Sequence, residues 1–180
     1  MYKIIIGVVI VAAVMIIGFM LIDPNVATNK TSQVQEVVNS ANGESYTIEG
    51  EVNKPGTYLL TDTVTMFDLI QASGGVTSNA DSLAYFEEVT LKSGSSYYIA
   101  SKFDNTDICN SSEIKKVNIN ADDADTLTSI NGITASIASS IVSYRSSNGT
   151  FKTLEQLLEV YGIGNATYHK IRNFVTLHAW

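Results

Sequence analysis

The chain has 180 residues, of which 45% are apolar, and it carries a formal net charge of −7. This length allows one ordinary domain or two small ones, and the pattern of motifs favours two. The single cysteine, Cys109, excludes an internal disulfide, so the folded part depends on its core. The acidic total argues against a polyanionic partner, but the distribution of charge matters more. Residues 46–116 carry ten acids and five bases, whereas residues 117–180 are nearly neutral, with five acids and four bases.

An apolar segment opens the chain. The 19 residues from Ile4 to Ile22 contain no charge, and a helix of that length spans roughly 28 Å, which matches the core of a bilayer. Lys3 before the segment and Asp23 after it favour a cytoplasmic N-terminus, with everything after Asp23 outside the cell. We therefore predict a transmembrane anchor over residues 1–22. A cleaved signal peptide is the alternative, but its apolar region is usually only about 7–15 residues long.

A polar segment over residues 23–45, rich in Asn, Ser, Thr and Gln, predicts a flexible linker. After it, short apolar stretches separated by turn residues are typical of strands. The predicted strands cover residues 46–52, 57–60, 89–92 and 96–100.

Turn and cap residues organise these strands. Pro55-Gly56 marks a turn between the first two strands, and Ser93-Gly94 predicts a hairpin between the last two. Thr65 and Asp68 form a capping box for a short helix that ends at Gly74-Gly75. Strands paired around one short helix predict a small α+β domain over residues 46–110.

Three motifs of this domain resemble those of the SLBB family, soluble-ligand-binding β-grasp domains. They are Gly50-Glu-Val-Asn-Lys-Pro-Gly-Thr-Tyr58, Asp68-Leu-Ile-Gln-Ala-Ser-Gly-Gly75 and Asn79-Ala-Asp81. The resemblance implies a β-grasp-like fold for residues 46–110. It leaves the ligand open, because related domains are associated with glycans, with other proteins or with structural roles.

An internal repeat near the end of the chain is its most informative feature. Leu127-Thr-Ser-Ile-Asn-Gly-Ile-Thr134 is echoed 30 positions later by Leu157-Leu-Glu-Val-Tyr-Gly-Ile-Gly164. In each copy a short apolar helix runs into a tight turn and a second helix starts at once, which indicates two similar units with one function.

The signals around the repeat predict four helices. Asn120 is placed to cap a helix from Ala121 to about Ser129, and Asn148-Gly149 ends a helix that starts at about Thr134. A capping box over residues 153–156 opens the third helix, and the last covers about residues 165–175.

A phosphate site is the chemistry expected of each turn. Glycine at its first position permits positive φ and a close approach of the backbone to a ligand, while Ile133 and Ile163 lock the turn into the core. The N–H groups of residues 134–136 and 164–166 then point outward, where each set can hold one phosphate. No base edge is read, so binding is independent of sequence. The candidate DNA-binding residues are Gly132, Ile133, Thr134, Ala135, Ser136, Gly162, Ile163, Gly164, Asn165, Ala166, Thr167, Lys170 and Arg172.

The motifs of residues 117–180 resemble, in order, the tandem helix-hairpin-helix domain of the ComEA-like competence DNA receptors. They are Val117-Asn-Ile-Asn120, Asn131-Gly-Ile133, Ile141-Val-Ser-Tyr-Arg145, Asn148-Gly-Thr-Phe-Lys152 and Tyr161-Gly-Ile-Gly164. With the apolar segment and the SLBB-like domain in front, the resemblance covers nearly the whole chain. It implies an all-α C-terminal domain and a membrane receptor that captures extracellular double-stranded DNA and hands it to DNA-uptake channel proteins during natural transformation.

Three positions depart from the pattern of that family. Thr134 stands where glycine is usual, and Ile137 and Ala166 stand where lysine is common. Affinity that comes from counterion release scales with the number of phosphates that bases neutralise. We therefore expect weak, strongly salt-sensitive binding, or binding by several copies of the chain on one DNA.

Catalytic signatures are missing from the sequence, which has no nucleophile elbow, no P-loop and no zinc-protease motif. Asp122, Asp123 and Asp125 fit the start of a helix better than a metal cluster. We predict a binding protein that is not an enzyme and uses no cofactor or metal. Two alternatives stay open: a tethered envelope scaffold that binds protein or glycan through its SLBB domain, with hairpins not used for DNA, and the accessory subunit of a nuclease.

Overall fold

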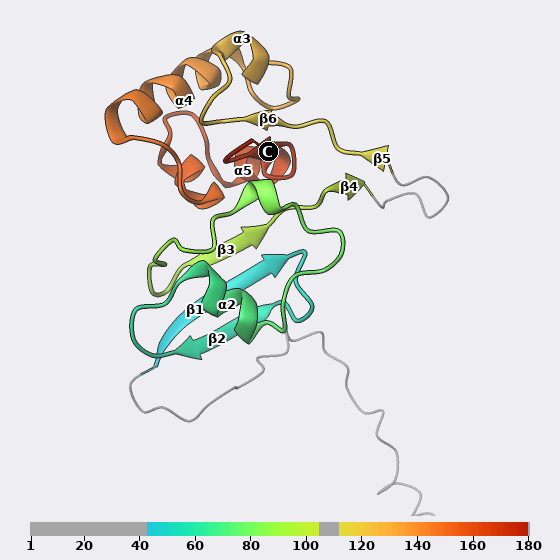
Figure 1. Cartoon of the computed structure of the whole chain (residues 1–180). Coiled ribbons are helices and arrows are strands. Elements are labelled where there is room, and N and C mark those ends of the chain that lie inside the picture. Colours follow the sequence, from blue (N-terminus) through green and yellow to red (C-terminus); the bar gives the residue numbers. More distant parts are fainter. Residues whose placement is uncertain (1–42, 105–111, 180) are drawn as a thin grey trace, which may run out of the picture. The chain divides into compact units, whose positions relative to one another are not determined.

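The first part of the described chain is built on a three-stranded sheet with strand order β2-β1-β3 (Figure 1). The computed structural model describes residues 43–104 and 112–179. Strand β1 (Glu44–Gly50) pairs antiparallel with β2 (Gly56–Leu60) and parallel with β3 (Ser96–Ile99). Because β1 begins at Glu44, the last two residues of the predicted linker belong to the sheet.

The predicted anchor over residues 1–22 lies outside the described residues, as does the predicted linker up to residue 42. Within residues 43–104 and 112–179, no helix combines the length and the apolar character that crossing a membrane requires.

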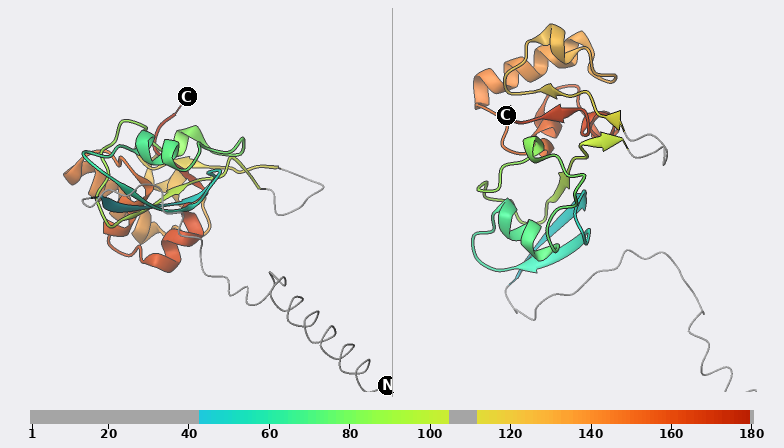
Figure 2. Two further views of the ribbon diagram at one scale, coloured as in Figure 1. Left: turned by 90° about the horizontal axis from the view of Figure 1, so that it is seen from below. Right: turned by 45° about the vertical axis from the view of Figure 1, so that its right-hand side comes forward.

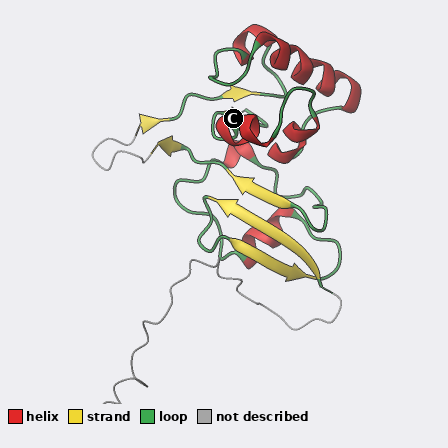
Figure 3. Ribbon diagram, turned by 180° about the vertical axis from the view of Figure 1, so that it is seen from behind, coloured by secondary structure: helices red, strands yellow, loops and turns green. Residues whose placement is uncertain are grey.

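Helix α2 (Met66–Ala72) covers one face of the sheet, and Figure 3 shows the sheet from the other side. The predicted capping box is confirmed. The Asp68 carboxylate accepts a hydrogen bond from the Thr65 backbone N–H at 2.9 Å, and the Thr65 hydroxyl accepts one from the Asp68 N–H at 3.3 Å. The helix buries three apolar side chains against the sheet. This first core contains Met66, Leu69 and Ile70 of α2 with Tyr46, Ile48, Tyr58, Tyr97 and Ile99 of the strands.

The predicted hairpin at Ser93-Gly94 is wrong. Residues 89–92 form no strand but only a single bridge at Thr90, beside the start of α2. Strand β3 pairs with β1 instead, which places Gly50 opposite Ile99. A Cβ atom on Gly50 would lie 2.1 Å from the Ile99 carbonyl oxygen. Glycine at position 50 therefore permits this long-range parallel pairing.

The second part of the described chain is the repeat region. One short strand pair precedes it, and a second pair joins its two ends. Strand β4 (Phe103–Asp104) pairs antiparallel with β5 (Ser112–Glu113), beyond the single-turn helix η1 (Ser82–Ala84). The repeat region comprises β6 (Val117–Asn118), α3 (Ala124–Leu127), α4 (Ala135–Asn148), the 3-10 helix η2 (Leu154–Glu159), α5 (Asn165–Ile171) and β7 (Val175–Thr176).

The sequence predicted an all-α domain here. That prediction is wrong, because β6 and β7 pair in parallel (Figure 2). The last helix ends at Ile171 rather than near residue 175. The Val117 N–H donates to the Phe174 carbonyl at 3.0 Å, and Val117 and Val175 are both buried. The pair joins segments almost 60 residues apart, a contact that helical periodicity cannot reveal.

Helix α3 also begins later than predicted, at Ala124, and its cap is Asp123 rather than Asn120. The Asn120 amide instead joins three segments of the domain. Its nitrogen donates to the carbonyls of Phe151 at 2.9 Å and Leu177 at 2.7 Å, and its oxygen accepts from the Phe151 N–H at 2.7 Å.

The core of the repeat region continues into the first domain. It is formed by fully buried residues such as Leu127, Ile141 and Ile171, and the same cluster includes Ala84 and Ala100 of the first domain. The core of the repeat region therefore reaches into the first domain, whose own core under α2 is a separate cluster.

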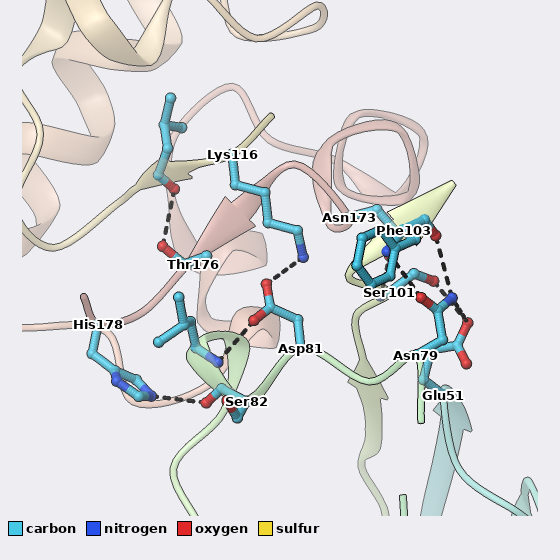
Figure 4. A network of polar contacts seen from close by, with 12 residues as sticks. Glu51, Asn79, Asp81, Ser82, Ser101, Phe103, Lys116, Asn173, Thr176 and His178 are labelled. Carbon is cyan, nitrogen blue, oxygen red and sulfur yellow. Dashed lines mark hydrogen bonds and ion pairs between the residues drawn. The ribbon is translucent and has the colours of Figure 1, made fainter. Parts of the chain in front are cut away.

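Polar contacts also join the two domains (Figure 4). The ammonium group of Lys116 pairs with the Asp81 carboxylate at 2.5 Å, with both side chains less than 10% exposed. Burial lowers the pKa of Lys116, an effect that the adjacent Asp81 carboxylate opposes. Asn173 follows α5, and its side-chain oxygen accepts a hydrogen bond from the Ser101 N–H at 3.1 Å. These contacts hold the repeat region in a defined place on the sheet domain.

Candidate nucleic-acid interface

The two copies of the repeat fold into the same backbone turn. Gly132 has a φ of 114° and Gly162 a φ of 92°, both in the left-handed region that favours glycine. The N–H groups of Ile133 and Ile163 donate to the carbonyl three residues back, at 3.0 and 3.1 Å. Both isoleucines are buried, which confirms that they lock the turn. We call residues 132–134 the first corner and residues 162–164 the second corner.

A new helix starts directly after each corner. Thr134 is the N-cap of α4, and its hydroxyl accepts a hydrogen bond from the Ile137 N–H at 3.3 Å. Gly164 is the N-cap of α5 and offers no side chain. The first N–H groups of a helix have no partner within that helix. Because Ala135, Ser136, Asn165 and Ala166 are all exposed, their backbone donors are available to a ligand.

The Thr134 departure from the family pattern has a structural explanation. Thr134 and Gly164 occupy the same place in the two copies, with φ values of −80° and −97°. Any residue adopts these values, so neither position requires glycine. A Cβ atom on Gly164 would have no atom within 4 Å. Threonine at position 134 is therefore free of strain, and its hydroxyl adds a cap that the second corner lacks.

Each corner packs against the helix that follows the other corner. A Cβ atom on Gly132 would lie 3.0 Å from Cγ2 of Ile171 and 3.1 Å from Cδ of Lys170, both in the last turn of α5. A Cβ atom on Gly162 would lie 3.4 Å from Cγ1 of Ile137, in the first turn of α4. The two corners are therefore neighbours, and the Lys170 side chain passes over the first corner although it belongs to the second copy.

Cations are scarce around the corners. In residues 117–179 the bases are Arg145, Lys152, Lys170 and Arg172. Arg145 donates to the Ile119 carbonyl at 2.8 Å, and the Lys152 ammonium lies 5.7 Å from the ring centroid of Phe86. Lys170 alone among these four bases has no ionic, aromatic or hydrogen-bonding partner in the described chain.

Arg172, which sequence reasoning grouped with the phosphate contacts, lies in the contact between the domains. Its guanidinium carbon lies 3.6 Å from the ring centroid of Tyr98, and its Nη1 lies 3.6 Å from an oxygen of Glu49. The structure therefore does not bring Arg172 together with the exposed donors of the corners.

A carboxylate from η2 holds α5 against the sheet. Oε1 of Glu155 accepts from the Tyr168 hydroxyl and from the Tyr98 N–H, each at 2.8 Å. Burial raises the pKa of Glu155, although these hydrogen bonds oppose the rise. Burial and the neighbouring carboxylate also raise the pKa of Tyr168. The network fixes the helix that forms one side of the second corner.

Tyr161 is a feature that sequence reasoning missed. Its side chain is 86% exposed, although the neighbouring Val160 and Ile163 are buried. It lines an open hollow along α4 together with Ser136, Ser140 and other residues of that helix. The matching residue of the first copy is Asn131, so the repeat itself gave no signal for an aromatic side chain here.

The aspartates predicted at a helix start only partly take that place. Asp123 caps α3 and accepts from the Thr126 N–H, whereas Asp122 lies before the helix and accepts from the Asn118 N–H, both at 2.8 Å. In the part of the chain that the structure describes, no group of three or more His, Cys, Asp or Glu residues is arranged to hold a metal ion.

Comparison with known protein families identifies both domains. Residues 112–176 match the family model of the helix-hairpin-helix motif, and residues 45–100 match that of the SLBB domain. The match to the SLBB domain therefore precedes the match to the helix-hairpin-helix motif along the chain.

Two curated proteins are similar to this chain. ComE operon protein 1 of Bacillus subtilis is 29% identical over 83% of this chain and 78% of its own length. An uncharacterized protein of Haemophilus influenzae is 49% identical over 32% of this chain and 53% of its own length. The first of these similarities covers most of both chains, which confirms the resemblance to ComEA-like proteins.

Proposed function

We propose that this chain, an SLBB domain followed by a helix-hairpin-helix motif, is a membrane-anchored receptor that binds double-stranded DNA without regard to its sequence. Its role is DNA uptake during natural transformation. The observation that carries the proposal is the pair of adjacent corners, each with exposed backbone donors after a left-handed glycine. The helix-hairpin-helix match and the similarity to ComE operon protein 1 support the proposal.

The corners bind the phosphate backbone rather than the bases. Backbone N–H groups of residues 134–136 and 164–166 donate to phosphate oxygens, and such contacts carry no sequence information. Thr134, Ser136, Asn165 and Thr167 add neutral hydroxyl or amide groups at the same places. Lys170 supplies the main ionic contribution, because its side chain lies over the first corner and has no partner in the described protein.

Binding of this kind has a shallow dependence on salt, in contrast to the strong salt sensitivity expected from the sequence. Each phosphate neutralised by a base contributes about 0.9 to the slope of log K against log salt concentration. A site with one available cation and several neutral donors is therefore weak, and its slope is smaller than that of a lysine-rich site. The receptor gains affinity when several copies bind one DNA molecule. Neighbouring copies and DNA-uptake channel proteins are the further partners that the proposal implies.

The location is part of the proposal. The uncharged run over residues 4–22 anchors the chain in the cell membrane, with the N-terminus in the cytoplasm and both domains outside a bacterial cell. Protease added to intact protoplasts should digest the SLBB and helix-hairpin-helix domains. Protection of both domains until the membrane is lysed would contradict this orientation.

DNA binding is tested with the full chain purified in detergent. Fluorescence anisotropy with several labelled duplexes of unrelated sequence should give the same dissociation constant for each, and affinity should fall as salt is raised. Absence of binding to every duplex at low salt would reject the proposal.

The scaffold function is the second candidate, and one observation favours it. Arg172, one of the few bases of the repeat region, is engaged with Tyr98 and Glu49 of the SLBB domain rather than left for a polyanion. If the chain fails to bind DNA but retains envelope proteins or glycan after nuclease treatment in high salt, this candidate replaces the first.

A further inference from the structure

The Tyr161 side chain is exposed to solvent, while buried neighbours hold its backbone in place. Val160 and Ile163 are 3% and 5% exposed, while Tyr161 is 86% exposed. The Val160 N–H donates to the Leu157 carbonyl at 3.1 Å, which completes the turn before the second corner. The position of the Tyr161 Cα atom is therefore set by buried neighbours. Tyr161 is also the most exposed of the large apolar or aromatic side chains in the described residues.

The surroundings of the ring place it beside both corners. Tyr161 directly precedes Gly162, whose backbone packs against Ile137 in the first turn of α4. It shares an open hollow with Ser136, the second residue of α4, whose backbone N–H is one of the donors assigned to the first corner. A phosphate backbone that contacts both sets of donors must therefore pass over or beside this ring.

The same hollow is free of charge. Its other lining residues are serines of α4 with Tyr144 and Asn148, and none of them is an acid or a base. Glu159 lies beside this lining, because its Oε2 accepts a hydrogen bond from the Tyr144 hydroxyl at 2.6 Å, so in a chain of net charge −7 the neutral lining reduces the repulsion of a polyanion without removing it. An aromatic ring in such a place offers apolar contact with the deoxyribose of the DNA backbone, which is independent of sequence because every nucleotide carries the same sugar.

We propose that Tyr161 is a DNA-contact residue that supplies non-ionic affinity, its ring packing against the deoxyribose of the strand held by the corners. This inference rests on the proposed function and adds to it a contact that does not depend on counterion release. Lys170 at the first corner provides the ionic part of the affinity, and Tyr161 before the second corner provides the apolar part.

The test compares salt dependences in the full chain in detergent, with labelled duplexes of unrelated sequence. Tyr161→Ala should weaken binding about fivefold to tenfold, as expected when an aromatic side chain loses partial burial, and leave the slope of log K against log salt unchanged. Tyr161→Phe, the matched control, should bind as the wild type does. Lys170→Ala should lower the slope by about 0.9. Because Tyr161 is exposed, its variants should unfold at the wild-type temperature.

The outcomes separate the inference from the function on which it rests. If the wild type binds the duplexes and Tyr161→Ala binds equally well, the inference is wrong and the receptor function stands. A weaker Tyr161→Ala whose salt slope has also fallen by about 0.9 contradicts a non-ionic role, and an equal loss in Tyr161→Phe contradicts an apolar one. If the wild type binds no duplex at low salt, both proposals fail.

Discussion

Proline at the first position of α4 and of α5 should remove DNA-binding donors while leaving the fold intact. Ala135 and Asn165 are the first residues of these helices, and both are exposed. Proline is well tolerated there, because the N–H that it lacks has no partner within the helix. The preceding residues, Thr134 and Gly164, have ψ values of 165° and 178°, which suit a residue before proline.

The expected loss follows from the hydrogen bonds removed. A hydrogen bond to a charged group contributes about 1.5–3 kcal/mol, and the lower end applies at an exposed site. Ala135→Pro and Asn165→Pro should each weaken duplex binding about tenfold. The double variant should weaken it about 100-fold if the two corners contribute independently.

The assay is fluorescence anisotropy with duplexes of unrelated sequence, together with thermal unfolding of each variant. Ala135→Ser and Asn165→Gln are the matched controls, because they change the side chain but keep the backbone N–H and the amide group at position 165. They should bind within about twofold of the wild type, since they retain every backbone donor. A double proline variant that stays folded and binds as tightly as the wild type would refute the assignment of these donors to phosphate.

Three further predictions concern stability. Gly132→Ala should lower the free energy of unfolding by about 1–3 kcal/mol, since φ is 114° there and a Cβ atom meets α5. Gly164→Ala, with ordinary φ and open space, should be nearly neutral in the same denaturant titration. Asn120→Ala should cost about 3 kcal/mol, because the buried Phe151 backbone loses both of its partners; a loss below about 1 kcal/mol would contradict this account. Because burial raises the pKa of Glu155, the stability of the wild type relative to Glu155→Gln should fall as pH rises above 4.5, and a pH-independent difference would show that the carboxyl does not titrate there.

The features that sequence predicted correctly are set by neighbouring residues. The capping box of Thr65 and Asp68 needs only local spacing, and so does the end of α4 at Gly149. The repeat identified Gly132 and Gly162 as left-handed turns, because only a residue without a Cβ atom fits such a place easily. The exposed donors of both corners follow directly from these turns.

The features that sequence missed depend on contacts between distant segments. The parallel pairing of β1 with β3 joins residues about 50 positions apart, so the local turn signal at Ser93-Gly94 was misleading. Asn120 had the spacing of a helix cap, but it was needed to join Phe151 to the end of the chain. Arg172 had the position of a phosphate ligand, yet the aromatic ring of Tyr98 lies beside it only in the folded protein.

The most direct test of the central claim is to follow the backbone amides of the corners by NMR during titration with duplexes of unrelated sequence. The amide resonances of Ala135, Ser136, Asn165 and Ala166 should shift together, equally for each duplex, and return toward their free positions as salt is added. Shifts that appear only in the SLBB domain, or that leave these four amides unmoved while DNA binds, would contradict that claim.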